Sequence, residues 1–265
     1  MRVVVVGGGF LSREAAAGVR NHGHEAVVVS DSSGVDAYRG VDLSETLDGC
    51  SVVIDLSDPL SLEDGIGADI DGLLLDDEAT MEKVCRSTAK LLAAEAAAGV
   101  RHHVALSVVG MGRLQEHGYF RALQAQEDLI RQSPMPYSII SATQLFESVG
   151  DIADAATEDG NVWVAPVQVR PVSCGEVATL IAHTAAFKPL FGVLEIAGPD
   201  QFRLDTFVRA GLTAAGDHRR VFTDDRSTYF GARLRRSDLL PSPHAYITQI
   251  HYNKWLSRQL PSVAR

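Results

Sequence analysis

Short apolar runs rich in β-branched residues alternate along the chain with stretches in which apolar residues recur at helical spacing. In the first 160 residues, the runs that predict strands are Arg2–Val6, Ala26–Ser30, Ser51–Leu56, His103–Ser107 and Tyr137–Ser141. The stretches that predict helices are Glu14–Asn21, Met81–Ala98, Tyr119–Arg131 and about Gln144–Thr157. Strands and helices that alternate in this way favour an α/β fold, with a parallel sheet covered by helices on both faces.

The alternation is looser after about residue 160. The predicted strands there are Val162–Ala165, Gly192–Ala197 and Arg220–Thr223. A capping box of the form S-x-x-E, Ser173 to Glu176, predicts the start of a helix that ends near Ala185. Two further helices are predicted over Asp205–Ala215 and Ala245–Leu260. We therefore expect residues 161–265 to form a small α+β cap region, packed on residues 1–160 as one continuous structural unit.

Composition narrows the class of protein. The 265 residues include 34 acidic and 24 basic side chains, for a net charge of −10, so a nucleic-acid partner is not expected. No apolar run is long enough to span a bilayer, and the N-terminal MRVVVVGGGF has no cleavable small-residue site. The three cysteines, Cys50, Cys85 and Cys174, are widely spaced, which indicates neither a disulfide framework nor a zinc site. We expect a cytoplasmic protein with a small-molecule substrate.

One acidic segment interrupts the regular alternation. From Asp55 to Glu78, with both included, there are nine acidic residues and no Lys or Arg, over a length greater than an ordinary connection. It is either a solvated acidic excursion or a lid or partner surface near the carboxyl edge of the sheet.

The clearest chemical motif is the turn Gly7-Gly8-Gly9, which joins the first predicted strand to the first helix. Glycine permits positive φ and lets the backbone touch a pyrophosphate, and the start of the helix offers unpaired N–H groups. The G-x-G-x-x-G frame ends in Ser12, where the third glycine is expected. The turn predicts dinucleotide binding; the alternative is a tight turn that no longer binds phosphate. The predicted cofactor-binding residues of the turn are Gly7, Gly9, Phe10 and Leu11.

An acidic residue, Asp31, lies 19 positions after Ser12 at the end of the second predicted strand. A carboxylate at this place can accept hydrogen bonds from an adenosine ribose and repels a 2′-phosphate, so Asp31 favours NAD over NADP. It is equally consistent with an Asp that caps the following turn.

A candidate catalytic pair consists of Ser107, at the carboxyl end of a predicted strand, and Tyr119, at the start of a predicted helix. Two hydroxyl groups can polarise a carbonyl and pass it a proton, but free tyrosine has a pKa near about 10. Leu123, one helical turn after Tyr119, supplies no cation to lower that pKa, and Arg121 points to a different helix face. His102 and His103, just before Ser107 in the chain, are interpreted as the exposed end of that strand.

Several segments resemble the NmrA-like group of atypical short-chain dehydrogenase/reductases. The similar segments are VVVVGGGFLSREAAAGVRNHGHEAVVVS, AAEAAAGVRHHVALSVVG, GYFRALQAQEDLI, PYSIISATQLFE and YFGARL. The resemblance covers nearly the whole chain and implies a Rossmann-type doubly wound sheet that binds NAD or NADP at the first turn.

The resemblance also implies roles for individual residues. The family's active-site Ser and Tyr match Ser107 and Tyr119, and Ser57 lies where a cofactor contact is expected, although simple turn chemistry explains it equally well. The family builds its nicotinamide and substrate pocket where this chain has Thr143, Gln144 and Phe146. Phe146 has the helical spacing of a core residue.

Three departures from the family bear on function. Leu123 replaces the lysine of Tyr-x-x-x-Lys, Asp31 stands where the family often has Arg, and the acidic segment adds length. The first hypothesis is an NAD(P)-dependent oxidoreductase acting on a small carbonyl, quinone or enone. The alternatives are a non-catalytic NAD(P)-binding sensor with a protein partner, and a repurposed non-redox biosynthetic enzyme.

Overall fold

The computed structural model describes residues 1–29, 43–57, 77–116 and 118–259. Across these residues the central sheet has seven parallel strands in the order β12-β9-β5-β4-β3-β1-β2. The strands are β1 (Arg2–Val6), β2 (Glu25–Val29), β3 (Cys50–Asp55), β4 (His102–Val108), β5 (Tyr137–Ala142), β9 (Gly192–Ala197) and β12 (Tyr246–Ile247). Strand β1 pairs with β2 on one side and with β3 on the other. The predicted α/β class and parallel sheet are confirmed.

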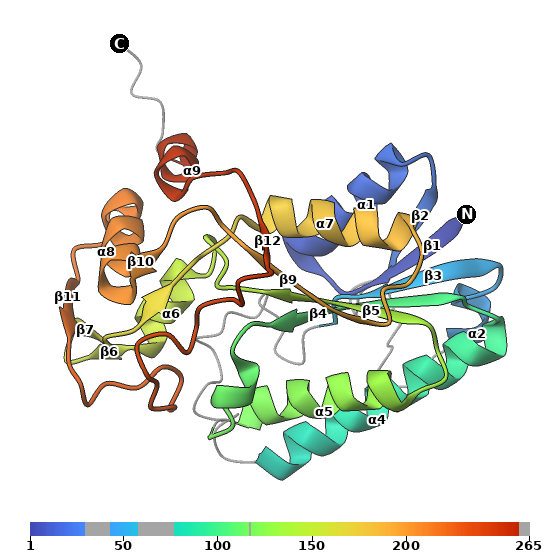
Figure 1. Ribbon diagram of the computed structural model, residues 1–265, viewed down its shortest axis with the longest axis horizontal. Coiled ribbons are helices and arrows are strands. Elements are labelled where there is room, and N and C mark those ends of the chain that lie inside the picture. The colour runs from blue at the N-terminus through green and yellow to red at the C-terminus, as the bar shows by residue number, and fades with distance from the viewer. Residues whose placement is uncertain (30–42, 58–76, 117, 260–265) are drawn as a thin grey trace. The chain divides into compact units, whose positions relative to one another are not determined.

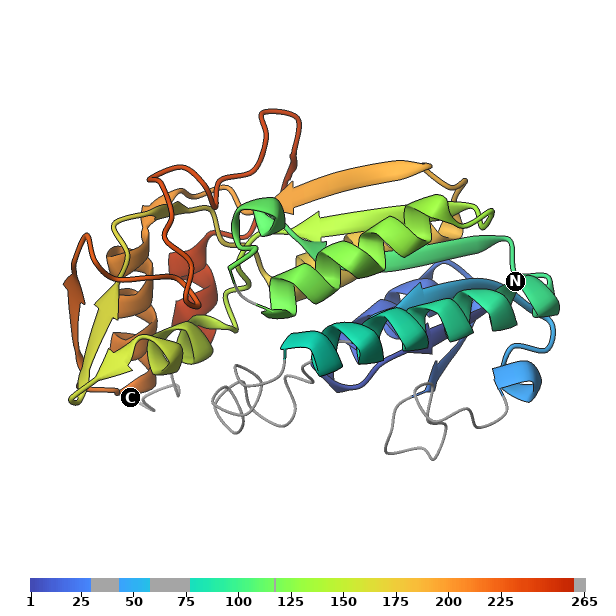
Figure 2. The same ribbon diagram turned by 90° about the horizontal axis from the view of Figure 1, so that it is seen from below.

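Helices cover both faces of this sheet, as Figure 1 shows. Helices α1 and α7 lie on one face, and α4 and α5 lie side by side on the other (Figures 1 and 2). Their bounds are α1 (Gly9–Asn21), α4 (Asp77–Ala98), α5 (Gly118–Gln132) and α7 (Cys174–Ala186), and a short helix α2 covers Leu43–Thr46. The doubly wound arrangement follows from the burial of the valine-rich strands, which need apolar cover on both sides.

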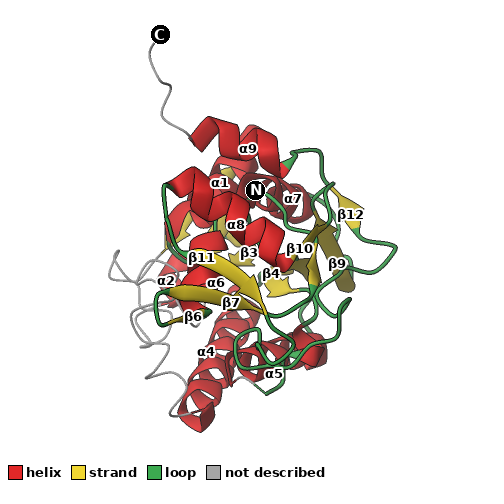
Figure 3. Ribbon diagram, turned by 90° about the vertical axis from the view of Figure 1, so that its left-hand side faces the viewer, coloured by secondary structure: helices red, strands yellow, loops and turns green. Residues whose placement is uncertain are grey.

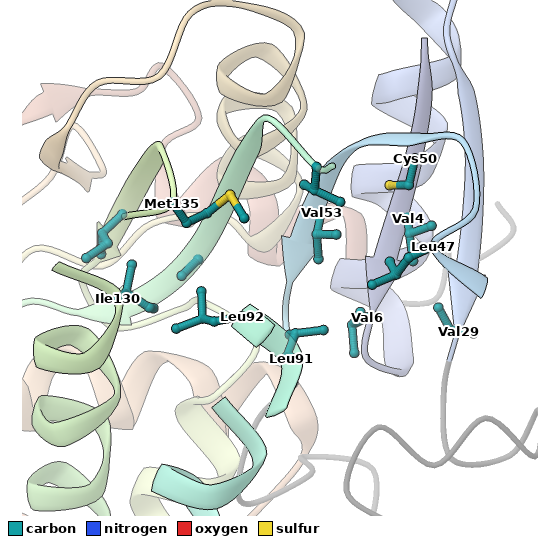
Figure 4. Packing of buried hydrophobic residues seen from close by; sticks show 13 residues of the cluster. Val4, Val6, Val29, Leu47, Cys50, Val53, Leu91, Leu92, Ile130 and Met135 are labelled. Atoms are coloured by element: carbon teal, nitrogen blue, oxygen red, sulfur yellow. The ribbon is translucent and has the colours of Figure 1, made fainter. Parts of the chain in front are cut away.

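The core under α4 and α5 is one apolar cluster (Figure 4). It joins β1, β3 and β4 to the two helices through side chains that are almost fully excluded from solvent. Its members are Val4, Val6, Val29, Leu47, Cys50, Val53, Leu91, Leu92, Val100, Ala105, Ile130, Met135 and Ile139. Ala105 of β4 and Ile130 of α5 belong to the same cluster, so this face of β4 is covered by α5.

The chain divides into two compact units. Unit 1 comprises residues 1–107, 118–141 and 177–194, and unit 2 comprises 108–117, 142–176 and 195–265. Unit 2 therefore takes residues from both sides of the expected boundary at residue 160.

Within unit 2, a three-stranded sheet has the order β11-β7-β6, and helices α6 and α8 pack against each other and contact its strands (Figure 3). The remaining elements are η3 (Met111–Arg113), α6 (Val149–Ala155), β6 (Thr157–Glu158), β7 (Asn161–Val164), β8 (Gln168–Val169), β10 (Phe202–Arg203), α8 (Leu204–Ala215), β11 (Arg220–Thr223) and α9 (Tyr252–Gln259).

Two predicted helices begin later than expected, and both starts are in unit 2. The helix predicted from Gln144 begins at Val149, because Leu145 forms a β-bridge with Val172 and Phe146 N donates to Val172 O at 2.8 Å. The helix predicted from Ala245 begins at Tyr252, since residues 246–247 pair with β9 as β12. In each case long-range backbone pairing replaces helical hydrogen bonds.

The predicted capping box at Ser173 does not form as expected, although α7 does begin at Cys174. The Glu176 carboxylate accepts hydrogen bonds from the backbone N–H groups of Gln249 and Ile250, at 2.9 and 3.1 Å. Glu176 therefore holds a distant segment of unit 2 instead of closing the first turn of its own helix.

Three further predictions concern membrane-spanning helices, the cysteines, and Asp31 together with the acidic segment. No helix of the described residues is long and apolar enough to cross a membrane. Cys50, Cys85 and Cys174 form no disulfide among the described residues. Asp31 and residues 58–76 of the acidic segment lie outside the described residues, so their roles stay predictions.

Candidate functional site

The carboxyl ends of β1 and β3 lie side by side at the point where the strand order reverses. From β1 the chain continues to β2 on one side of the sheet and later to β3 on the other. Val6 at the end of β1 is paired with Asp55 at the end of β3. Ligands of open α/β sheets bind outside the strand carboxyl ends at such a reversal. The glycine turn after β1 and Ser57 after β3 are therefore placed beside each other at the expected binding position.

Gly7 is required by its surroundings. Its φ is +130°, and a Cβ at this position would lie 2.5 Å from the carbonyl oxygen of Leu56. The close approach is held by two backbone hydrogen bonds of 2.8 Å, from Gly7 N to Val29 O and from Leu56 N to Val6 O. Any larger residue would push the turn away from β3, so the backbone here keeps its path only with glycine.

Helix α1 begins at Gly9, five residues before the predicted start at Glu14. Gly8 at the N-cap has no side chain to accept the first N–H groups, and the first turn contains no acidic residue. The helix N-terminus therefore keeps its hydrogen-bond donors and partial positive charge for an external anion. Phe10 is exposed and Leu11 is half-buried in this first turn.

Ser12 occupies the third position of the glycine frame and is completely buried. Its Oγ lies 3.1 Å from the position that a Cβ on Gly7 would take, and it has no hydrogen-bond partner among the described residues. A serine is small enough for the close helix–strand packing that the third glycine usually permits. These features fit a pyrophosphate. The glycine turn has no Cβ atoms, the first N–H groups of α1 are uncapped, and the buried Ser12 hydroxyl has no partner among the described residues.

On the β3 side, Ser57 is bound to a buried carboxylate. Ser57 N donates to Asp55 Oδ1 at 3.0 Å, and Ser57 Oγ donates to the same oxygen. Gln126 Nε2 of α5 donates to Asp55 Oδ2 at 3.3 Å, and Asp55 is 4% exposed. The sequence reasoning did not assign Asp55 or Gln126 a role. The available signal was an acidic residue inside the apolar run CSVVID, because a charged side chain in a buried strand needs partners.

Ser107 and Tyr119 belong to the same unit and to the same side of the sheet. Side chains alternate along a strand, so Ser107 shares a face of β4 with Ala105, which packs in the cluster with Ile130 of α5. Ser107 is buried near the carboxyl end of β4, and Tyr119 is the second residue of α5. Leu123 is buried one turn later. The elements are those predicted, and the catalytic pairing of the two hydroxyl groups stays a prediction.

The expectation that His102 and His103 form an exposed strand end is wrong. Both lie within β4 and are 3% and 0% exposed. His102 Nε2 is hydrogen-bonded to Ser138 Oγ at 2.8 Å, and burial lowers the pKa of His102 to about 4. Polar partners inside the core let the strand extend beyond the apolar run that predicted it.

His103 forms a fully buried pair with Glu95 of α4, with 2.9 Å between His103 Nδ1 and Glu95 Oε1. Burial raises the pKa of Glu95, although His103 acts against this shift. Burial alone would lower the pKa of His103, but the Glu95 carboxylate, its hydrogen bond and the charge of Asp55 raise it above its usual value. The pair thus favours a protonated imidazole inside the α4/α5 side of the sheet.

The three predicted substrate residues lie in unit 2. Thr143 is buried and donates to Arg170 O at 2.7 Å, and Gln144 is also buried. Phe146 is 1% exposed, and its ring lies 4.9 Å from the Tyr252 ring and 5.6 Å from the Trp255 ring, centre to centre. A substrate contact at Phe146 would require this aromatic cluster to open, so its position is that of a core residue. Among the described residues no group of acidic, His or Cys side chains could hold a metal ion.

Comparisons with known proteins support the fold. No protein-family model matches the sequence, and no curated protein is detectably similar to it. Among solved structures, the dTDP-glucose 4,6-dehydratase DesIV from Streptomyces venezuelae, with NAD and TYD bound, is 14% identical with a TM-score of 0.68, covering 98% of this chain and 95% of that one.

Two other similar structures carry a nicotinamide dinucleotide. The dTDP-4-dehydrorhamnose reductase from Bacillus anthracis in complex with NADP is 12% identical, with a TM-score of 0.65 over 98% of this chain and 93% of that one. The UDP-glucose 4-epimerase from Thermus thermophilus in complex with NAD is 16% identical, with a TM-score of 0.62 over 91% and 92%. These neighbours are Rossmann-fold enzymes of the short-chain dehydrogenase/reductase type, so the predicted Rossmann-type fold is confirmed.

Proposed function

We propose that the chain is an NAD(P)-dependent oxidoreductase of the short-chain dehydrogenase/reductase type, in its NmrA-like group, which acts on a small carbonyl, quinone or enone. The observation that carries the proposal is the glycine turn. There Gly7 is forced by the approach of Leu56, and α1 begins without a capping side chain. The similar structures with NAD or NADP support the same cofactor class.

The residues that would hold the cofactor are on β1, α1 and β3. The backbone of Gly7 and Gly9 and the N-terminus of α1 would bind the pyrophosphate, with Ser12 beneath the turn. Phe10 and Leu11 would lie against it, and Ser57 would contact the cofactor from the β3 side. When bound, such a cofactor supplies or accepts a hydride.

Two hydroxyl groups on the α5 side would act on the substrate. Ser107 would hold the carbonyl oxygen by a hydrogen bond, and Tyr119 would donate a proton to that oxygen or withdraw one. Leu123 leaves this tyrosine without the lysine that the family places one turn later. We therefore expect turnover to be slow relative to a family member that carries the lysine. Thr143 and Gln144 of unit 2 remain the proposed substrate contacts.

A second candidate function, an NAD(P)-binding sensor without chemistry and with a protein partner, is favoured by the same Leu123. The side chain is 5% exposed and is packed in α5, so its position is occupied by an apolar group where the family has a cation. In either case we propose that the protein is cytoplasmic.

The test is a calorimetric titration of the purified chain with NADH and with NADPH, repeated on Gly9→Glu. We expect binding of at least one cofactor, and its loss in the variant, because a carboxylate at the start of α1 would occupy and repel the phosphate position. Preference for NADH would agree with the role predicted for Asp31. If neither cofactor binds, the proposal is wrong.

Turnover separates the two candidates. A panel of small carbonyls, quinones and enones, with reduced cofactor followed by absorbance, should show consumption that Tyr119→Phe abolishes. Binding without any consumption, together with capture of a specific protein partner, would favour the sensor instead.

A further inference from the structure

We propose that Asp55 is a positioning residue that makes Ser57 a hydrogen-bond acceptor, so that Ser57 receives a donor group of the dinucleotide, a ribose hydroxyl or the carboxamide N–H, and not a phosphate oxygen. This inference rests on the proposed function, because it assigns a contact within the proposed cofactor site. It adds Asp55, which no sequence motif singled out, and it states which part of the cofactor lies against the end of β3.

The hydrogen bonds of Ser57 determine what its hydroxyl group can offer a ligand. A serine hydroxyl has one proton to donate and two lone pairs to accept with. Both donors of Ser57, its N–H and its O–H, are directed to Asp55 Oδ1. The half-buried Ser57 Oγ is then left with acceptor capacity only. A phosphate oxygen needs a donor, whereas a hydroxyl or amide of the ligand needs an acceptor.

The position of Asp55 is fixed from several directions. It is the last residue of β3, and its backbone is paired with Val6 of β1 and with Ala105 of β4. Its second carboxylate oxygen accepts from Gln126 Nε2 at 3.3 Å. With both oxygens engaged and the side chain 4% exposed, the carboxylate has little freedom to turn and release Ser57.

The charge of Asp55 also disfavours a phosphate at Ser57. A carboxylate directly behind Ser57 would repel a phosphate, because like charges a few ångströms apart raise the free energy of binding. The β3 side of the crevice is thus suited to neutral donors, while the N-terminus of α1 is suited to the pyrophosphate. The two sides would bind chemically different parts of one ligand.

The Gln126 contact links Asp55 to α5, the helix that carries Tyr119. Gln126 follows Leu123 by three residues and Tyr119 by seven, so all three lie on neighbouring positions of one face of α5. Asp55 therefore joins the segment that would contact the cofactor to the helix that carries the proposed proton donor. Displacing Gln126 should affect turnover more than cofactor affinity.

The experiment is a double-mutant cycle on NADH affinity, measured by titration. Asp55→Leu removes the acceptor and frees the Ser57 hydroxyl proton, and we expect about tenfold weaker binding. Ser57→Ala should weaken binding to a similar extent, and Asp55→Leu in the Ser57→Ala background should add nothing. Asp55→Asn keeps an acceptor for Ser57 and should restore affinity to within about threefold of the original.

Two controls separate positioning from stability. Ser51→Ala, at the other end of β3, removes a hydroxyl that accepts from Arg101 at 3.3 Å, and it should leave affinity unchanged. Thermal unfolding of each variant reports loss of structure, and a structural role for Asp55 would lower stability equally in both Ser57 backgrounds. If Asp55→Leu does not fold, the smaller Asp55→Ala takes its place in the cycle, with the same expected loss in the Ser57 background and no further loss in Ser57→Ala.

A final arm uses ADP-ribose, which lacks the carboxamide. Inorganic pyrophosphate, which has neither a ribose hydroxyl nor a carboxamide, is titrated beside it. A Ser57→Ala effect that persists with ADP-ribose but is absent with pyrophosphate identifies a ribose hydroxyl as the donor, and an effect that disappears with ADP-ribose identifies the carboxamide; both support the proposal. Weaker pyrophosphate binding in Ser57→Ala would show a phosphate contact and overturn it. Additive effects in the cycle, or unchanged affinity in Ser57→Ala, overturn it while leaving the proposed function intact. An unaltered chain that binds neither NADH nor NADPH overturns both.

Discussion

Helices α1 and α5 belong to the same unit, and each carries residues of the proposed site in its first turns. The start of α1 has what an anion requires, with a glycine N-cap, no acidic residue in the first turn and a buried hydroxyl beneath it. The start of α5 has Tyr119 in place, but one turn later it presents the buried Leu123 where the resembling family has lysine.

This contrast indicates that the proposed cofactor binding and the proposed proton transfer would depend on separate groups of the chain. The proposed phosphate position is formed by backbone groups and by the absence of Cβ atoms, so we expect any side chain added there to weaken binding. The proposed proton-transfer position depends on one side chain, Tyr119, and on the charge near it. Substitutions can therefore remove or improve cofactor binding without changing proton transfer, and the reverse.

The largest effect is expected from Gly7→Ala. The added Cβ would meet Leu56 O at 2.5 Å, and a positive φ of 130° is strained for alanine. We expect cofactor binding and turnover to be lost, and the free energy of unfolding to fall by about 2–4 kcal/mol. Titration and chemical denaturation measure the two effects.

Gly23→Ala is the matched control for Gly7→Ala, since Gly23 also has positive φ, of 78°, but no atom within 4 Å of a built Cβ. It should cost only about 1 kcal/mol of stability and leave binding intact. Equal effects of the two substitutions would show that backbone strain alone, and not the approach to β3, explains the turn.

The second effect concerns α5 alone. Tyr119→Phe removes the proposed proton donor while keeping the ring, so turnover should fall by about 10²- to 10⁴-fold with NADH affinity unchanged. Steady-state rates and titration on the same preparation measure both. Turnover that persists in Tyr119→Phe would show that Tyr119 is not the proton donor and that α5 has no catalytic role.

The third effect is a gain. Leu123→Lys places a cation one turn from Tyr119, which lowers the pKa of a neighbouring tyrosine, so we expect about tenfold faster turnover and a rate profile shifted to lower pH. Leu123 is buried, so the variant should also lose about 2–4 kcal/mol of stability. Leu123→Met, which keeps the volume without the charge, should show neither the gain nor the shift of the profile.

The sequence predicted those parts of the molecule whose causes are local. Valine-rich runs, the glycine turn and the apolar spacing of α5 determined the strand and helix positions within a few residues, because each depends on neighbours in the chain. The predicted start of α1 at Glu14 is five residues late, because glycine lowers helix propensity in a helix interior but is tolerated at a helix N-terminus.

The parts that could not be predicted depend on contacts between distant segments. His103 was interpreted as exposed, yet it meets Glu95 of the preceding helix inside the core. The end of β3 meets Gln126, 71 residues away in the chain. Leu145 and Phe146 pair with Val172 instead of starting a helix. None of these pairings leaves a periodic pattern, although a buried charge in an apolar strand does indicate that a partner exists.

The smallest change in turnover is expected from a variant that tests whether a more distant cation influences proton transfer at Tyr119 of α5. Among the described buried groups, the candidate on its side of the sheet is His103, which shares a face of β4 with Ser107. Four residues of strand separate them by about 13 Å, too far for a direct effect on a proton moved at Ser107 or Tyr119. We expect Glu95→Gln, which removes the carboxylate that raises the pKa of His103, to change turnover by less than about twofold with an unmoved pH profile.

The same variant should change the pH dependence of stability, and the sign follows from the raised pKa values. The folded state holds the proton of His103 more tightly than the unfolded chain, so this stabilisation is present below about pH 6.5 and is lost as pH rises through the raised value. The raised pKa of Glu95 acts in the same direction, because its ionisation is disfavoured in the folded state above about pH 4.5. In Glu95→Gln the free energy of unfolding, measured by denaturation between about pH 5 and 9, should therefore fall less steeply with pH. A shift of the turnover profile together with the stability profile would show that His103 supplies the charge that Leu123 does not, and the contrast between α1 and α5 would then be wrong.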